Sequence, residues 1–318
     1  MHVSADTENF TERSGSSRYA RLLLTSPGDP WEIERHVFRG RTLDFSRKFL
    51  PDGLTLLDRL DFLEPDETRL LSQLQGRTYA ATFGLVERVI GATALLQAQR
   101  HVHGDAAAVE SLVRFANDEL KHQELFRRLD RMMHARMPHG YTIVAAPEQF
   151  ARAVLGRSAW SLLALACHIE LLAQAHYEQA FESRVDLCPL YQDVFKFHSR
   201  DERQHALFDE LEWVAEHTHL SAEQRDGAVI DFIALLTAFS DVLLAQSQAD
   251  TRYYLQAVGR RFSPLQARQV ASTMLAACRW QFVVSGMQHV HFRRLLNSMT
   301  TAEQCARIMT ALQPVMQA

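Results

Sequence analysis

DELKH at residues 118–122 and DERQH at residues 201–205 are two copies of one short pattern, Asp-Glu-x-x-His. A further glutamate precedes the glutamate of each copy at the same separation, Glu87 before Glu119 and Glu170 before Glu202. The equivalent positions of the two copies therefore keep a constant offset along the chain. We infer that a pair of helices occurs twice, and we call residues 87–122 the first half and residues 170–205 the second half.

The spacing within each copy brings two metal-binding side chains together. Residues three apart share a face of a helix, so Glu119 and His122 can point at one spot, as can Glu202 and His205. The two preceding glutamates stand among small or apolar neighbours at helical spacing. A carboxylate in such surroundings is costly to bury without a counter-charge. The pattern therefore predicts that four glutamates and two histidines meet around cations in the core of a bundle.

Composition excludes several other classes of protein. The chain has 318 residues, of which 47% are hydrophobic and 23% charged, with a net charge of −4. The apolar fraction is too high for disorder, and the absence of a basic excess argues against nucleic-acid binding. The 13 glycines and 9 prolines are few for an all-β chain. The four cysteines form no C-x-x-C pair, which predicts buried free thiols and excludes a zinc-finger framework. Without a signal-peptide core or an uncharged apolar stretch of 18 residues, the sequence predicts a cytoplasmic protein with no membrane contact.

Hydrophobic periodicity predicts six long helices and a short last one. Their expected ranges are about 65–102, 106–135, 147–183, 189–217, 221–259, 264–298 and the residues after 300. Residues 1–60 carry Ser, Gly, Pro and Asp punctuation, which predicts a mobile start and an irregular or short-helical lead-in. Residues 61–318 are expected to form one helical-bundle domain.

Over roughly residues 65–220 the chain resembles the ferritin-like di-metal carboxylate proteins. In these bundles two helices each give one Glu, and two others each give Glu-x-x-His. The resemblance implies an all-α, ferritin-like helical bundle with a di-metal site in a four-helix core and extra C-terminal helices. It implies two iron ions, with manganese as the alternative, because carboxylate and imidazole suit both metals. The implied ligands are Glu87, Glu119, His122, Glu170, Glu202 and His205.

Each copy also contains an aspartate directly before its glutamate. Asp118 and Asp201 are suited to accept a hydrogen bond from the outer N–H of a ligand histidine. The alternative is that both are ordinary carboxylates on the helix surface.

One residue breaks the repeat. His198 stands one turn before Glu202 and two turns before His205, whereas the equivalent position of the first half is Phe115. The pattern His-x-x-x-Glu-x-x-His resembles the amine N-oxygenases typified by para-aminobenzoate N-oxygenase, in which an additional histidine binds one iron. The resemblance implies that His198 is a seventh ligand. The alternative is a core histidine that hydrogen-bonds a ligand carboxylate.

The same resemblance implies the function. It is that of a non-haem di-iron monooxygenase, an oxidoreductase that uses O₂ to oxidise a small aromatic amine to a hydroxylamine, nitroso or nitro product in natural-product biosynthesis. Electrons would come from a separate reductase or ferredoxin, and a homodimer is expected. No catalytic residue is predicted beyond the metal ligands. Candidate residues for the substrate pocket, which are equally consistent with ordinary core, are Tyr79, Phe83, Gln174 and Tyr177.

Three other functions share the di-metal bundle. An acyl desaturase or hydroxylase remains open, although the additional histidine is not part of that pattern. A ribonucleotide-reductase-like radical subunit usually keeps a tyrosine one turn after the first ligand histidine, where this chain has Phe126. Iron storage is disfavoured, because ferritins are much shorter.

Overall fold

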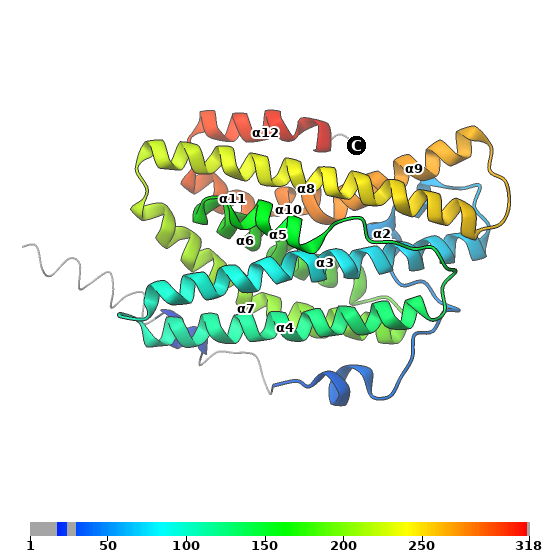
Figure 1. Cartoon of the computed structure of the whole chain (residues 1–318), viewed down its shortest axis with the longest axis horizontal. Helices are drawn as coiled ribbons and strands as arrows, with labels where there is room; N and C mark the ends of the chain where they lie inside the picture. Colours follow the sequence, from blue (N-terminus) through cyan, green and yellow to red (C-terminus); the bar gives the residue numbers. More distant parts are fainter. Residues whose placement is uncertain (1–17, 24–29, 317–318) are drawn as a thin grey trace, which may run out of the picture.

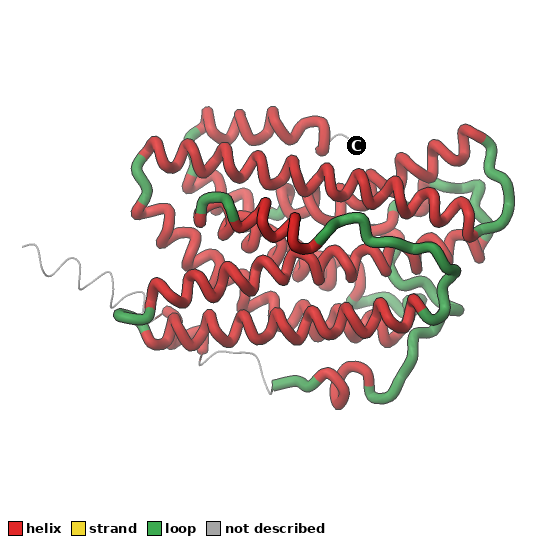
Figure 2. The backbone as a smooth tube through the Cα atoms, viewed as in Figure 1, coloured by secondary structure: helices red, strands yellow, loops and turns green. Residues whose placement is uncertain are grey.

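Helices provide all the regular secondary structure of the described chain. A computed structural model describes residues 18–23 and 30–316. The chain is 80% helical, and the described residues contain no β-strand, only an isolated bridge between Lys48 and Leu187. The predicted all-α class is therefore confirmed. The helices run mostly along the long axis of the molecule, and the loops gather at its two ends (Figures 1 and 2).

Five long helices form the body of the protein. They are α3 (Pro65–His101), α4 (Ala106–His134), α6 (Ala159–His176), α7 (Pro189–His219) and α8 (Ala222–Ala257). The shorter elements are η1 (Ile33–Phe38), α2 (Asp52–Thr55), η2 (Leu57–Arg59), α5 (Pro147–Leu155), η3 (Tyr177–Phe181), α9 (Pro264–Arg279), η4 (Trp280–Val284), α10 (Ser285–Gln288), α11 (Val290–Met299) and α12 (Ala302–Met316).

Local sequence explains where the long helices begin. Pro65 occupies the first turn of α3, where its missing N–H costs no hydrogen bond, and Glu64 and Glu67 form a capping box around it. Ser221 caps α8 in the same way together with Gln224. The starts predicted at about residues 65 and 221 are confirmed to within one residue.

The helix predicted over 147–183 is wrong, because the structure divides it into α5, α6 and η3. The first break lies at residues 156–158. Gly156 ends α5, and Ser158 takes an extended conformation as the residue before α6. The backbone N–H of Ser158 donates to Asp231 of α8 over 2.9 Å, so a partner distant in sequence stabilises the break.

The helix predicted over 264–298 is also interrupted. After the π-helical turn η4 and the short α10, His289 takes an extended conformation and its side chain accepts the backbone N–H of Phe292. Histidine is an unusual capping residue, so the sequence carried little sign of this break.

Two helix pairs enclose the middle of the molecule. α3 packs along α4, and α6 packs along α7. Contacts of α4 with α7 and of α3 with α6 close these pairs into a four-helix arrangement. α8 packs against the outside of α6 and carries α9 and α12 (Figure 1).

The lead-in packs onto this bundle. Residues 30–60 consist of short helical turns, as predicted, and they bury Trp31, Phe38, Phe49 and Leu50. η1 lies against α7. The predicted mobile start falls on residues 1–17, which lie outside the described residues.

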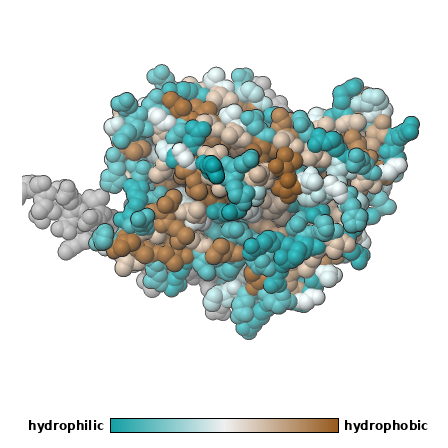
Figure 3. Space-filling view, in the orientation of Figure 1, coloured by the Kyte–Doolittle hydropathy of each residue, from teal (hydrophilic) through white to brown (hydrophobic). Residues whose placement is uncertain are grey.

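Two helices, α3 and α8, contain windows long and apolar enough to cross a membrane by length and composition alone. Within the protein, 67% of the α3 window and 44% of the α8 window are buried. Core helices of soluble proteins pass the same test, so this is a weak indication. On the face shown in Figure 3, apolar atoms form separate groups among polar ones, one of them at the adjoining ends of α3 and α4, where Leu95 and Val102 are exposed.

Candidate metal centre

The four-helix arrangement brings all seven predicted ligands into its interior. Each of these residues is at most 1% exposed. α3 contributes Glu87, α4 contributes Glu119 and His122, α6 contributes Glu170, and α7 contributes His198, Glu202 and His205. Four helices that are separate in sequence thus meet at one buried cluster of carboxylates and imidazoles.

Two groups of four side chains offer ligand atoms close enough to hold a metal ion. In each group the four atoms lie within 4.8 Å of one another. Both groups contain His122 and Glu202, and the two therefore adjoin. The first is completed by Glu87 and His198, and the second by Glu119 and His205.

Glu170 belongs to neither group, but it faces Glu202. Burial and the neighbouring Glu202 carboxylate raise the pKa of Glu170 well above its usual value. Gln174, one turn further along α6, donates to the backbone carbonyl of Glu202 over 2.9 Å. This contact fixes α6 against α7 beside the cluster.

Polar atoms of the cluster lack hydrogen-bond partners. Both carboxylate oxygens of Glu119, Oε2 of Glu87, Oε1 of Glu170 and Nδ1 of His122 are buried without one. Such atoms are expensive to leave unpaired in a protein interior. His205 Nδ1 lies 3.1 Å from Glu119 Oε1 without a hydrogen bond between them. Lone pairs that converge without pairing are what a shared cation requires, so the donor set fits metal ions.

Close approach of α3 and α4 depends on Gly91. A Cβ atom at this position would lie 3.1 Å from the Cβ of Glu119. That is tighter than ordinary van der Waals contact, so even an alanine here would require α3 or Glu119 to shift by a few tenths of an ångström. Gly91 stands one turn after Glu87, and the two positions together explain why this face of α3 can carry a carboxylate beside α4.

The two predicted outer aspartates lie beside the two ligand histidines, but each serves the histidine of the other half. Asp201 Oδ2 is 3.2 Å from His122 Nε2, and Asp118 Oδ2 is 3.6 Å from His205 Nε2. In both histidines Nε2 faces the aspartate, while Nδ1 faces the glutamates. Asp201 hydrogen-bonds His122, whereas Asp118 only lies near His205, and in both rings Nδ1 is the inward ligand atom.

Sequence reasoning missed Trp31, which the lead-in brings onto the centre. Its indole N–H donates to both oxygens of Asp201 over 3.0 Å, and its ring lies parallel to that of His122 at 6.3 Å. Lys121 lies 4.3 Å above the Trp31 ring and 2.8 Å from Asp118. A tryptophan 170 residues from Asp201 gives no local sign of this contact.

His198 lies between the two halves of the cluster. Its Nε2 is 2.6 Å from Glu87 Oε1 and 2.7 Å from Glu202 Oε1. The rings of Phe83 and Phe126 meet it edge-on at 5.1 and 5.3 Å. The histidine therefore reaches two predicted ligands from inside an aromatic pocket. These contacts are compatible with both alternatives, a seventh ligand and a hydrogen-bond donor to ligand carboxylates.

The charges of the metal-free cluster are strongly coupled. Burial raises the pKa of Glu87 to about 7, against the opposing effect of His198. Burial lowers the pKa of His198, but Glu202 and Glu87 outweigh it and raise the value to about 9. Burial likewise opposes ionisation of Glu202, yet the surrounding histidines lower its pKa well below the usual value. Protons on imidazole and carboxylate thus balance the charge in the metal-free protein, and binding of cations must displace them.

Asp209 is a second residue that sequence reasoning missed. It is 4% exposed and lies one turn beyond His205 on α7, with Oδ2 unpaired. Burial raises its pKa well above the usual value, although the charge of His205 opposes the shift. Its equivalent in the first half is Phe126, so the repeat that singles out His198 also singles out Asp209.

The four predicted pocket residues lie in packed surroundings. Tyr79 is buried and hydrogen-bonds Nδ1 of His176 over 2.8 Å, and Phe83 packs edge-on against it at 4.9 Å. Tyr177 stacks near Phe181 in η3. Neither of the two cavities described below is lined by these residues or by Gln174.

Comparison with known proteins adds no relative, since no protein-family model and no curated protein sequence matches this chain.

Proposed function

We propose that this chain is a ferritin-like non-haem di-iron monooxygenase that oxidises a small aromatic amine at nitrogen with O₂. The observation that carries the proposal is the pair of adjoining ligand groups that share His122 and Glu202. Three helices supply these groups, and α6 adds Glu170 facing Glu202, so that the four helices together match the ligand pattern of ferritin-like bundles, two with one Glu and two with Glu-x-x-His. Unpaired oxygens within the cluster support the presence of cations.

The donor set favours iron or manganese over softer metals. Carboxylates and imidazoles are the ligands, and the described residues place no thiol among them. Carboxylates stabilise high oxidation states, while histidine nitrogen suits divalent ions of intermediate softness. Two irons held here would supply the site at which O₂ is bound and reduced, with electrons replenished by a reductase or ferredoxin.

The protein's own side chains prepare the site for this chemistry. Asp201 and Asp118 lie beside the outer nitrogens of the ligand histidines, so that each Nδ1 is directed inward at the glutamates. Phe83, Phe126 and Phe195 surround His198 and exclude water from this side of the centre. Exclusion of water protects reactive oxygen species from side reactions.

The assignment of nitrogen as the oxidised atom rests on His198. Its contacts with Glu87 and Glu202 are compatible with the seventh, nitrogen ligand that the resemblance implies, which would make the two metal positions unequal. The resemblance of the His198 pattern to amine N-oxygenases then favours amines over C–H bonds. A tyrosyl-radical function is disfavoured, because Phe126 occupies the position of the radical tyrosine.

Metal analysis and product analysis test the proposal together. The purified protein should bind about two metal ions per chain, and the reduced iron form should convert arylamines to hydroxylamine, nitroso or nitro products on exposure to O₂. Fatty-acyl and hydrocarbon substrates should be offered in parallel. Desaturated or C-hydroxylated products with untouched amines would assign the protein to the desaturase or hydroxylase class.

A matched pair of variants on α7 controls this experiment. Glu202→Gln should lose metal and activity. Glu210→Gln changes the same residue type eight positions later, where the carboxylate pairs with His291 and not with the cluster, and should retain both. Full metal binding by the Glu202 variant would contradict the proposed site.

A further inference from the structure

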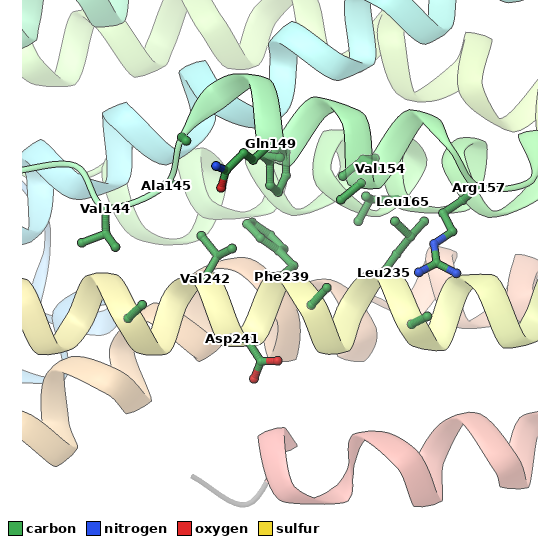
Figure 4. Close-up of a pocket in the computed structure, with 16 residues that line it drawn as sticks. Val144, Ala145, Gln149, Val154, Arg157, Leu165, Leu235, Phe239, Asp241 and Val242 are labelled. Carbon is green, nitrogen blue, oxygen red and sulfur yellow. The ribbon is translucent and has the colours of Figure 1, made fainter.

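An apolar cleft lies between α5 and α8, one helix layer away from the metal centre. Its volume is about 400 Å³, within the range of small-molecule binding sites. Figure 4 shows side chains of the two helices directed toward each other across it. Most of its wall is hydrocarbon, including Phe150, Val154, Leu165, Leu235, Phe239 and Val242.

The charged residues of the cleft leave its interior neutral. Arg157 pairs with Asp231 over 3.2 Å at one end of the cleft, which neutralises its charge. Asp241 points away from the space between the helices (Figure 4). Gln149 is the remaining polar lining residue with a long side chain. A charged ligand group would therefore lose its hydration without gaining a partner, so the cleft favours an uncharged, apolar occupant.

The inner wall of the cleft is shared with a second, small cavity of about 10 Å³. Phe150, Val154 and Leu165 line both. The second cavity extends between α3 and α6, where its lining includes Ile90 and Ala166. Ile90 follows Glu87 by three residues and Ala166 precedes Glu170 by one turn, so this cavity lies beside the helix faces that carry two predicted ligands.

We propose that the α5–α8 cleft is the entry site for an uncharged aromatic substrate, which reaches the metal centre past a barrier formed by Phe150, Val154 and Leu165. The identity of the substrate class rests on the proposed oxygenase function. An arylamine fits both the apolar wall and the lack of a charge partner, because its amino group is neutral near pH 7. An alkylamine or a fatty acid is charged at that pH and fits less well.

Binding to the metal-free protein tests the cleft independently of the chemistry. The probe is 1-naphthylamine, whose fluorescence responds to an apolar environment, with decanoate and decylammonium as charged comparisons. Ala238→Trp places an indole at the exposed rim of the cleft, while Thr237→Trp places one on the adjacent exposed position outside it. We expect naphthylamine binding to weaken at least tenfold in the Ala238 variant and to be unchanged in the Thr237 variant.

Three results would overturn the entry site: no naphthylamine binding by the wild type, equal binding by the two tryptophan variants, or tighter binding of either charged probe. Metal content after the same preparations are loaded with Fe²⁺ separates this inference from the proposed function. A preparation that takes up two metals but does not bind the probe contradicts the cleft alone. A preparation that binds the probe but takes up no metal contradicts the di-iron function alone.

The connection to the metal centre has its own readout. In protein loaded with Mn²⁺, a paramagnetic ion, the naphthylamine proton resonances should broaden more than in metal-free protein. Phe150→Ala opens the barrier and should increase this broadening, with unchanged metal content. If the resonances broaden in neither the Mn²⁺-loaded wild type nor the Mn²⁺-loaded Phe150 variant, the cleft does not lead to the metal centre.

Discussion

The two halves of the metal centre present equivalent ligands but different neighbours. Phe115 of the first half stacks on His205 at 4.0 Å, whereas its equivalent in the second half, His198, meets His122 edge-on at 4.7 Å. The next turn of each ligand helix differs as well, with Phe126 in the first half and Asp209 in the second. The first half thus has a phenylalanine at both positions, Phe115 and Phe126, whereas the second half has an ionisable residue at both, His198 and Asp209.

This difference separates two roles of the repeat. The duplicated positions supply what any pair of cations needs, namely carboxylates and imidazoles on four helices. The positions that depart from duplication add the imidazole of His198 beside His122 and the ring of Phe115 beside His205, with the buried carboxyl of Asp209 one turn beyond. Each ligand group contains two imidazoles and two carboxylates, but the first group takes one imidazole from a position outside the repeat, and variants at these positions can test what this asymmetry does.

The largest effect is expected from removing a carboxylate that both ligand groups share. Glu202→Gln should weaken metal binding by about 3–5 kcal/mol, because it leaves buried partners without compensation. Glu119→Gln affects one group and should lose one ion while retaining the other. Titration with Fe²⁺ or Mn²⁺, followed by metal analysis after gel filtration, measures both. If the two variants bind the same number of ions, Glu202 and Glu119 do not differ in the number of ion sites that they serve.

Asp250 is a reference for the comparison, since it is a buried carboxylate outside the metal centre. It accepts hydrogen bonds from Thr78 and Gln246 at 2.6 and 2.8 Å, and burial raises its pKa to about 7. The unfolded group ionises near its usual value of 3.8, so the folded protein binds more protons between about pH 4 and 7 and loses stability as pH rises through this range.

Asp250→Asn should remove that pH dependence. Between pH 5 and 8 the unfolding free energy of the wild type should fall by roughly 2–3 kcal/mol relative to the variant. Urea denaturation of both metal-free proteins at the two pH values gives this difference. If the unfolding free energies of the wild type and the variant change equally between pH 5 and 8, Asp250 ionises normally in the folded state.

The outer aspartates sharpen the comparison between halves. Asp201→Asn and Asp118→Asn should each lower metal affinity by about 10–100-fold, because they loosen a ligand histidine. The Asp201 variant should lie at the upper end, since Asp201 is closer to its histidine and also holds Trp31. Competition with a chelator measures the two affinities, and a larger loss in the Asp118 variant would contradict this order.

The smallest effect on affinity is expected where the repeat is broken. His198→Phe introduces the residue that the first half has at position 115. It should lower the affinity for one metal ion by about tenfold while the bundle stays folded. Mössbauer spectra of the iron-loaded variant should then show two more similar irons. If spectra and affinity both match the wild type, His198 does not bind metal, and its contacts with Glu87 and Glu202 are hydrogen bonds.

The sequence alone determined four long helices, α3, α4, α7 and α8, and the cluster of buried acids and histidines, because both follow from short-range spacing. A face shared every three or four residues fixes Glu119 beside His122 wherever the helix lies, and an exact repeat transfers the same geometry to Glu202 and His205. The offset of the repeat also distinguishes Asp209, because the equivalent position of the first half holds Phe126.

Only the tertiary structure decided which elements complete the centre. Packing between segments far apart in sequence produces three of its features. Trp31 contacts Asp201, each outer aspartate lies beside the ligand histidine of the other half, and a helix break precedes α6. The α5–α8 cleft likewise exists because two apolar helix faces do not meet completely. Periodicity shows which face of a helix is buried, but it carries no information on which partner covers that face or how closely.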